Sequence, residues 1–156
     1  MPRSDAARVT RRSALTAGGI GLAGFASLPR AAEAAELTAT EKANVQIVTD
    51  FCGAFSGHNL DRIMSFFAET CAYRVTEAQE PYKGRQAVTD RIRSSLERIE
   101  RFEVIESLAK GPMVFNERKD SFTGGPLKTW HGVGVFFLKD GKIVEWYDYT
   151  ISMERA

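Results

Sequence analysis

From Phe102 to Ile151 the apolar residues recur with the two-residue period of β-strands, and this stretch constrains the fold more than any other. Segments 102–108, 113–122, 127–138 and 142–151 alternate in this way. They are separated by Gly111-Pro112, by residues 123–126, and by Asp140-Gly141, and an Asp-Gly pair between two such runs is a strong hairpin signal. The pattern therefore predicts a four-stranded antiparallel meander.

Residues 38–99 show helical spacing instead. Thr38 and Glu41 have the three-residue separation of a capping box, in which each side chain satisfies a backbone amide of the other. The apolar residues that follow predict a helix that ends at Gly57. Two further helices are expected at residues 60–68 and 85–99, with a short strand at 72–75 and a loop at 77–84 between them.

The order of elements predicts an α+β fold, with three helices, one early strand and then the meander. We expect a curved sheet whose concave face is covered by the helices, so that a pocket lies between them. The arginines and acids of the helix at 85–99 lie opposite its apolar face, and we interpret them as a solvated surface.

The N-terminal residues have the composition of an export signal. Arg11-Arg12 precede an apolar, glycine-spaced run at residues 14–28, and small residues around Ala32-Glu33-Ala34 follow. The motif around the two arginines resembles the bacterial twin-arginine signal. We therefore expect an export signal at 1–34, a single domain at 35–156, and a periplasmic or extracellular location. An uncleaved anchor or a misassigned start are the alternatives.

Composition limits the classes of partner. The chain of 156 residues is 44% hydrophobic and 26% charged, which is typical of one globular domain. A formal net charge of +1 gives no reason to expect nucleic acid, and we expect no stable membrane insertion once the signal is removed. Cys52 and Cys71 are the only cysteines and are interpreted as buried thiols. No spacing of ligands predicts a zinc site.

Three charged residues fall where the pattern predicts an apolar face. Arg118 and Asp120 point the same way from one strand, between Val114 and Phe122, because strand side chains change face at every residue. Asp148 is expected to share the face of Val144 and Trp146 on the last strand. Buried charges are costly unless paired, so one arginine shared by two carboxylates is the natural arrangement. Two acids whose pKa values differ are what acid/base chemistry needs, and we therefore predict an active site.

The hairpin at Asp140-Gly141 decides which residues surround Asp148. A two-residue turn would place Asp148 on the face of His131, Val133 and Val135. A type I turn with a glycine bulge would place it with Trp130, Gly132, Gly134 and Phe136. We favour the second, because Gly132 and Gly134 would leave room for a cavity and alternating glycines in a strand otherwise weaken it.

Several of these motifs resemble the limonene-1,2-epoxide hydrolase family. They are the strand Asn116-Glu-Arg118-Lys-Asp120, the hairpin at residues 134–143, and the ending Glu145-Trp-Tyr-Asp148-Tyr-Thr150. The wider pattern resembles the nuclear-transport-factor-like cone superfamily, which includes ketosteroid isomerases and SnoaL-type polyketide cyclases. The resemblance covers about residues 38–155 and implies a cone-shaped, mostly antiparallel mixed sheet.

The resemblance also implies a reaction, namely the one-step addition of water to a small apolar, terpene-like epoxide without a cofactor. Asp148 would be the base that activates water, and Asp120 the acid that protonates the epoxide oxygen. Arg118 would hold both carboxylates, and Tyr73 would help to position the water. The family's third water ligand, an asparagine, is replaced here by Val75, with Thr76 beside it.

The remaining expectations concern the pocket, the surface and other functions. Trp130, Trp146 and Phe122 are candidates for contacts with the substrate. His131 is expected at the surface or at a subunit interface. The resemblance implies a homodimer through the outer face of the sheet, with Val133, Tyr147 and Tyr149 as candidate contacts. The alternatives to a hydrolase are a binding protein without turnover, an isomerase or cyclase, and a charged network that only fixes the register of the strands.

Overall fold

The computed structural model describes residues 36–155, and the export signal predicted at 1–34 lies outside them. Helix α1 (Ala39–Ala54) continues into a 3-10 turn, η1 (Phe55–Gly57), and is followed by the short helix α2 (Leu60–Met64). Strands β1 (Phe67–Arg74) and β2 (Tyr82–Lys83) precede helix α3 (Arg85–Leu96). The meander then runs through β3 (Ile99–Lys110), β4 (Met113–Phe122), β5 (Leu127–Lys139) and β6 (Lys142–Arg155).

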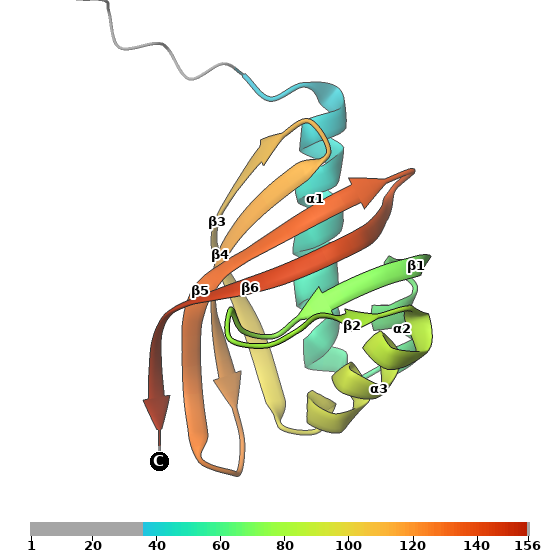
Figure 1. The fold of residues 1–156 in the computed structure, drawn as a ribbon. Coiled ribbons are helices and arrows are strands. Elements are labelled where there is room, and N and C mark those ends of the chain that lie inside the picture. The colour runs from blue at the N-terminus through green and yellow to red at the C-terminus, as the bar shows by residue number, and fades with distance from the viewer. Residues whose placement is uncertain (1–35, 156) are drawn as a thin grey trace, which may run out of the picture. The chain divides into compact units, whose positions relative to one another are not determined.

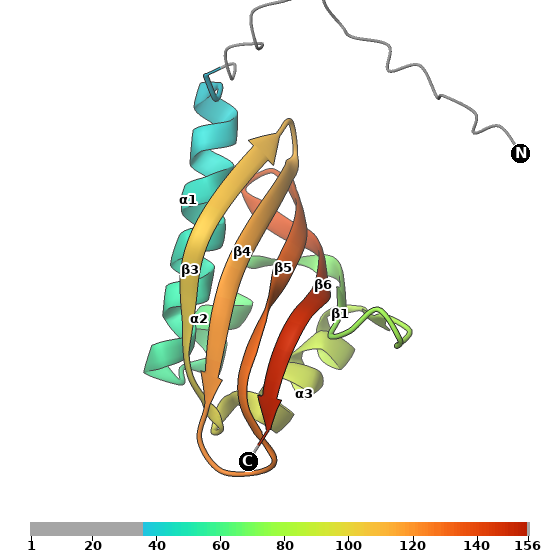
Figure 2. The same ribbon diagram turned by 90° about the vertical axis from the view of Figure 1, so that its left-hand side faces the viewer.

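These strands form one curved six-stranded sheet in the order β2-β1-β6-β5-β4-β3 (Figure 1). Only β1 and β6 run parallel, so the sheet is mixed but mostly antiparallel, and the predicted α+β class and meander are confirmed. The helices lie on one side of the sheet. Figure 2 shows the outer face of β3–β6 toward the viewer, with α1 and α3 behind it.

The core lies between α1 and the concave face. Its centre is Phe51, whose ring meets those of Phe136 and Trp146 edge-on at centroid distances of 5.8 and 5.1 Å. The predicted capping box starts α1, since Thr38 Oγ1 accepts from the Glu41 amide and a Glu41 carboxylate oxygen accepts from the Thr38 amide. Phe51 thus packs α1 against the sheet, with the C-terminal end of the helix beside β6.

Several predicted boundaries are wrong. The second helix ends at Met64, because Phe67 enters β1 and the Phe66 carbonyl accepts from the Ile143 amide of β6 at 2.8 Å. The third ends at Leu96, and Ile99 begins β3 instead. The predicted loop at 77–84 contains strand β2, which pairs with β1. In each case pairing with a distant strand overrides local helical or loop preference.

The β5–β6 hairpin combines both registers considered from sequence. Lys139 pairs with Lys142, and Asp140 and Gly141 have φ of 50° and 72°, so the turn has two residues rather than the predicted three. A bulge at Val144 then shifts the pairing by one residue, and Asp148 lies opposite Gly134, as predicted. The bulge puts Ile143 in the core and leaves Val144 half-buried, so the expectation that Val144 shares the face of Asp148 is wrong.

Both cysteines are buried and free, as predicted. The ring of His131 lies on the outer face, half-exposed, with Nε2 2.8 Å from a Glu117 carboxylate oxygen. Tyr149 is exposed on that face and Val133 and Tyr147 are half-exposed, so the homodimer stays a prediction. Among the described residues, no helix has the length and apolarity needed to cross a bilayer.

Candidate active site

Arg118 lies between two carboxylates in the interior of the sheet. Its Nε donates to Asp120 Oδ1 and its Nη2 donates to Asp148 Oδ1, each at 3.0 Å. All three side chains are at least 95% buried. Such short, charge-assisted contacts offset the free-energy cost of removing three charges from water.

The guanidinium of Arg118 is surrounded by aromatic rings. Its central carbon lies 4.8 Å from the ring centre of Trp130, 4.9 Å from that of Phe102 and 5.3 Å from that of Trp146. The remaining amino nitrogen, Nη1, is buried and has no hydrogen-bond partner within residues 36–155. The ring faces therefore take the place of water around part of the cation.

Asp148 is held by donors from three directions. Oδ1 accepts from Trp146 Nε1 at 2.7 Å as well as from Arg118, and Oδ2 accepts from the Tyr73 hydroxyl at 3.4 Å. The Tyr73 ring stacks on Trp146 with a centroid distance of 3.8 Å and an angle of 12°. These contacts bring β1 and β6 together at the carboxylate and leave Oδ2 as its less occupied oxygen.

The two carboxyl groups differ in how well their charged forms are stabilised. Burial raises the pKa of Asp120 from 3.8 to about 7, against the lowering effect of Arg118. Burial also raises the pKa of Asp148, against the charge of Arg118 and hydrogen bonds from Trp146, Arg118 and Tyr73. Because Asp148 accepts from three side chains and Asp120 from Arg118 alone, Asp148 is the better site for negative charge and Asp120 for a proton.

Two glycines of β5 make room for this arrangement. A Cβ at Gly134 would lie 2.5 Å from Arg118 Nη1 and 2.7 Å from Phe136 Cε2. A Cβ at Gly132 would collide with the Trp130 ring and the Tyr149 carbonyl oxygen. The alternating glycines thus allow the guanidinium and the indole to lie flat against the strand.

Replacing Gly134 with alanine is expected to destabilise the fold by about 1–3 kcal/mol, because the buried Arg118 and Phe136 must move to admit a methyl group. Urea denaturation measures the change. Gly53→Ala is the matched control, since a Cβ at this exposed site in α1 meets nothing within 4 Å. The control is expected to gain up to about 1 kcal/mol from the better helix propensity of alanine. Equal stability changes in the two variants would contradict the close approach.

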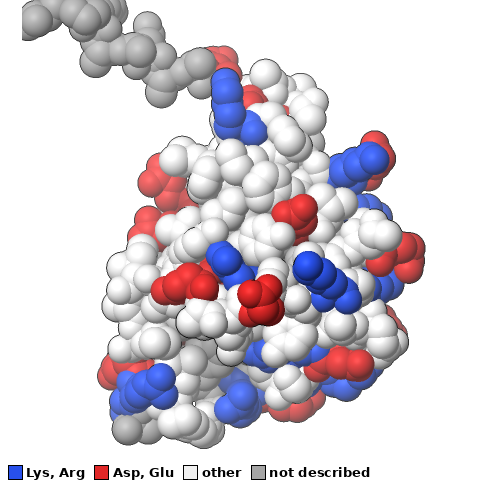
Figure 3. Space-filling model, in the orientation of Figure 1, with Lys and Arg blue, Asp and Glu red and all other residues white. Residues whose placement is uncertain are grey.

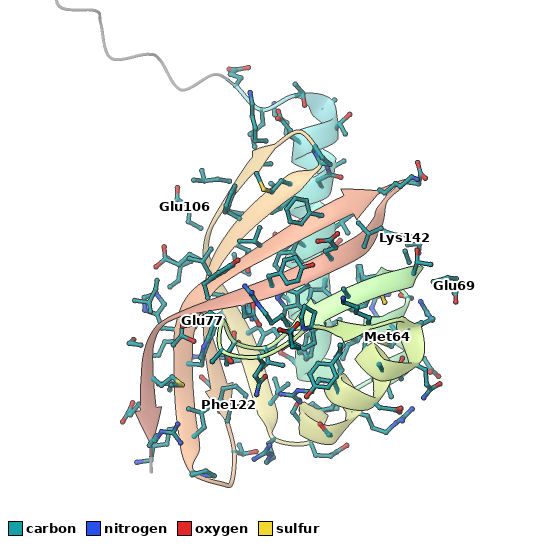
Figure 4. The ribbon with its side chains drawn as sticks, in the orientation of Figure 1. Met64, Glu69, Glu77, Glu106, Phe122 and Lys142 are labelled. Atoms are coloured by element: carbon teal, nitrogen blue, oxygen red, sulfur yellow. The ribbon has the colours of Figure 1, made fainter. Side chains whose placement is uncertain are left out.

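Both acids face a cavity of about 160 Å³ that opens between the sheet, α3 and the β4–β5 turn. Phe122, labelled in Figure 4, is among the residues that line it. Its inner lining includes Tyr73, Asp120, Asp148, Phe102, Phe122 and Trp130. Within residues 36–155, no group of three or more His, Cys, Asp or Glu side chains could hold a metal ion.

Comparison with known proteins identifies the family. A model of the SnoaL-like domain matches residues 48–146. The chain belongs to the SnoaL-like family. No curated protein sequence matches it. Among solved structures, the SnoaL-like chain is similar to an LEH-like epoxide hydrolase from M. tuberculosis, with 23% identity over 71% of this chain and 84% of that one, and a TM-score of 0.63.

Two further structures have the same fold. The epoxide hydrolase/cyclase-like enzyme SalBIII, described in pyran ring formation in the polyether salinomycin, is 21% identical over 70% of this chain and 92% of that one, with a TM-score of 0.66. A putative SnoaL-like polyketide cyclase from Jannaschia sp. CCS1 is 16% identical over 75% and 91%, with a TM-score of 0.64. At these identities the likeness establishes the NTF2-like cone fold, and the reaction has to be argued from the site.

The structure of this SnoaL-like protein brings the predicted site residues together, with two qualifications. Trp130 and Phe122 line the cavity, but Trp146 lies behind Asp148 and positions it rather than facing a ligand. Val75 and Thr76 both line the cavity. Val75 therefore presents an apolar side chain to the cavity, at the position where the resemblance to limonene-1,2-epoxide hydrolases implies an asparagine.

Sequence reasoning missed the part of the site supplied by α3 and the residues after it. Arg91, Ser95 and Arg98 line the cavity, although the charged face of this helix was interpreted as solvated surface. Met153, beyond the predicted end of the last strand, lines it too. No acid lies three or four residues from Arg91, so the helix itself offers this arginine no ion pair.

Proposed function

We propose that the protein is a cofactor-independent epoxide hydrolase that adds water to a small, mostly apolar epoxide in one step. The observation that carries the proposal is the buried Arg118 bridge between two carboxyl groups that face one apolar cavity. Asp148 and Asp120 have the different environments that a base and an acid require. The fold of epoxide hydrolases is consistent with this reading.

In the proposed reaction, a water molecule sits beside Asp148 Oδ2 and the Tyr73 hydroxyl. Asp148 takes a proton from this water. At the same time the water oxygen attacks an epoxide carbon, and the bond from that carbon to the epoxide oxygen breaks. Asp120 gives its proton to the departing oxygen, so that the product is a neutral diol. The proton on Asp148 is then released to solvent and Asp120 takes one up from solvent, which restores the starting state.

Acid assistance matters because an alkoxide is a poor leaving group at neutral pH, even from a strained ring. Each positioned proton transfer contributes about 10²–10⁴-fold. Val75 offers no hydrogen bond where the family resemblance implies an asparagine. In this protein Asp148 and Tyr73 would therefore hold the water with one partner fewer.

The test is diol formation by the domain at residues 35–156 from a panel of small epoxides in ¹⁸O-labelled water. With enzyme in excess, one-step addition puts the label into the diol during the first turnover. An unlabelled first-turnover diol would mean that a carboxylate of the enzyme attacks the epoxide. Tight binding of an apolar ligand with no diol from any epoxide would favour the alternative of a binding protein.

The proposed roles predict how activity depends on pH. The acid must be protonated, and the pKa of Asp120 is about 7, so kcat/KM is expected to fall as the pH rises above about 7, by up to tenfold per unit. It should also fall at low pH, as Asp148 becomes protonated, which makes the profile bell-shaped. Steady-state rates between pH 4 and 9 provide the measurement. A rate that keeps rising above pH 8 would exclude Asp120 as the acid.

Surface charge is consistent with a small-molecule substrate. On the face shown in Figure 3, basic and acidic side chains are scattered among uncharged ones. A protein that binds nucleic acid would instead gather its basic side chains into a patch or stripe.

A further inference from the structure

Four charged side chains line the cavity, and their signs are separated in space. Asp120 and Asp148 come from the interior of β4 and β6, and Arg118 lies against them. Arg91 comes from α3, and Arg98 from the turn between α3 and β3. Arg98 is exposed and Arg91 half-buried, so the two arginines lie toward the opening and the two acids at the floor.

The two cavity arginines lack the partners that other arginines of this region have. Arg85 and Arg93 of α3 pair with Glu69 and Asp90. Within residues 36–155, no carboxylate lies within 4.0 Å of Arg91 or of Arg98. The acids of this region thus neutralise the arginines that face away from the cavity and leave the cavity side positive.

Arg91 is held in place by neutral groups. Its Nη1 donates to Ser94 Oγ at 3.1 Å and to Ser95 Oγ at 3.0 Å. These two bonds use one nitrogen, so the rest of the planar fork keeps its donors for another acceptor. Hydroxyl partners position the guanidinium without cancelling its charge.

The β4–β5 turn lies against Arg98. Its carbonyl accepts from the Thr123 amide at 2.8 Å. A Cβ at Gly125 would lie 3.0 Å from Arg98 Nη1, and Gly125 has a φ of 75°, so this glycine lets the turn approach the guanidinium closely. The β4–β5 turn and the second positive charge thus lie side by side at the opening.

We propose that the substrate is a small apolar epoxide that carries a carboxylate, bound with this group at Arg91 and Arg98. Guanidinium groups bind carboxylates through paired, charge-assisted hydrogen bonds, whereas the negative Asp148 at the floor repels them. The two ends of the cavity would thus orient the ligand with its epoxide toward Asp120 and Asp148. The epoxide in this inference rests on the proposed hydrolase function. The carboxylate rests only on the two arginines.

Binding tests the carboxylate separately from turnover. Octanoate and 1-octanol have the same chain length, and titration calorimetry gives their affinities, with tryptophan fluorescence as a second readout because Trp130 lines the cavity. Octanoate is expected to bind at least about tenfold tighter, a difference of about 1.4 kcal/mol. Arg98→Gln should reduce that preference, and Arg91→Gln with Arg98→Gln should abolish it. Arg93→Gln is the matched control, since Arg93 is in the same helix but does not line the cavity.

Turnover of 7,8-epoxyoctanoate and of its methyl ester separates the two proposals. A higher kcat/KM for the acid, lost in the double variant but not in Arg93→Gln, supports both. Equal kcat/KM for acid and ester overturns the carboxylate site and leaves the hydrolase standing. No diol from either compound, with an arginine-dependent preference for octanoate, overturns the hydrolase alone. Equal binding of octanoate and 1-octanol by the wild type overturns the carboxylate site whatever the turnover.

Discussion

Replacement of Asp120 by asparagine is expected to lower kcat/KM for epoxide hydration by about 10²–10⁴-fold, because the amide keeps the size of the acid but has no proton to give to the epoxide oxygen. In the wild type, Arg118 Nε donates to Asp120 Oδ1 at 3.0 Å, and the side-chain oxygen of asparagine can accept the same hydrogen bond. The fold should therefore survive, and circular dichroism and thermal unfolding would check this. Steady-state kinetics with an epoxide that the wild type hydrolyses give the activity.

Glu117→Gln is the matched control for this experiment. Glu117 lies on the same strand but faces the outer side, where its carboxylate meets His131. The same change from acid to amide should leave kcat/KM within about twofold there, because surface substitutions away from the site have small effects. Turnover by Asp120→Asn at the wild-type rate would rule out the acid role. An equal loss of kcat/KM in both variants would mean that removing a negative charge anywhere on the strand lowers activity.

Replacement of Arg118 by methionine is expected to destabilise the fold by about 3–5 kcal/mol, because it leaves two buried carboxyl groups without their cation. The guanidinium also contacts three aromatic rings, and methionine can replace only part of that packing. Urea denaturation at pH 8 measures the loss. Arg101→Met is the control, since its partner Glu103 and the arginine itself are exposed, and such pairs contribute about 0–1 kcal/mol.

The loss in Arg118→Met should shrink as the pH falls. Without the cation, burial raises the folded-state pKa of both carboxyl groups further above their unfolded value of 3.8. Below that value the groups are protonated in both states and cost little. Above it, the folded state keeps protons on these carboxyl groups that the unfolded chain releases. The free energy of unfolding therefore falls by up to about 1.4 kcal/mol per pH unit for each group. A stability difference that does not change between pH 4 and 8 would contradict this account.

Much of the site follows from local pattern alone. The period of two in β4 puts Arg118 and Asp120 on one face whatever the rest of the chain does, because successive side chains of a strand alternate. The mixture of apolar neighbours and charges on that face indicates burial with pairing, since unpaired buried charges are too costly to retain. The capping box and Asp140-Gly141 mark element ends for equally local reasons.

The hairpin shows where local pattern stops being sufficient. The correct partner of Asp148, Gly134, was predicted with the wrong turn, and the bulge at Val144 made up the difference of one residue. A bulge leaves no reliable mark in sequence, because it depends on how two strands fit the curved sheet around α1. Phe67 is a second example. It was predicted to lie in a helix, and its place in β1 depends on pairing with β6.

The sequence by itself determined the strand period, the order of elements, and the identity of the three charged residues at the centre of the sheet, because each depends on neighbours a few positions away. Only the tertiary structure decided that Tyr73 donates to Asp148, and that Arg91 and Arg98 line the cavity. These arrangements bring together residues that lie far apart in the chain. The physical reason is that their geometry is set by how the layers pack, which no local spacing encodes.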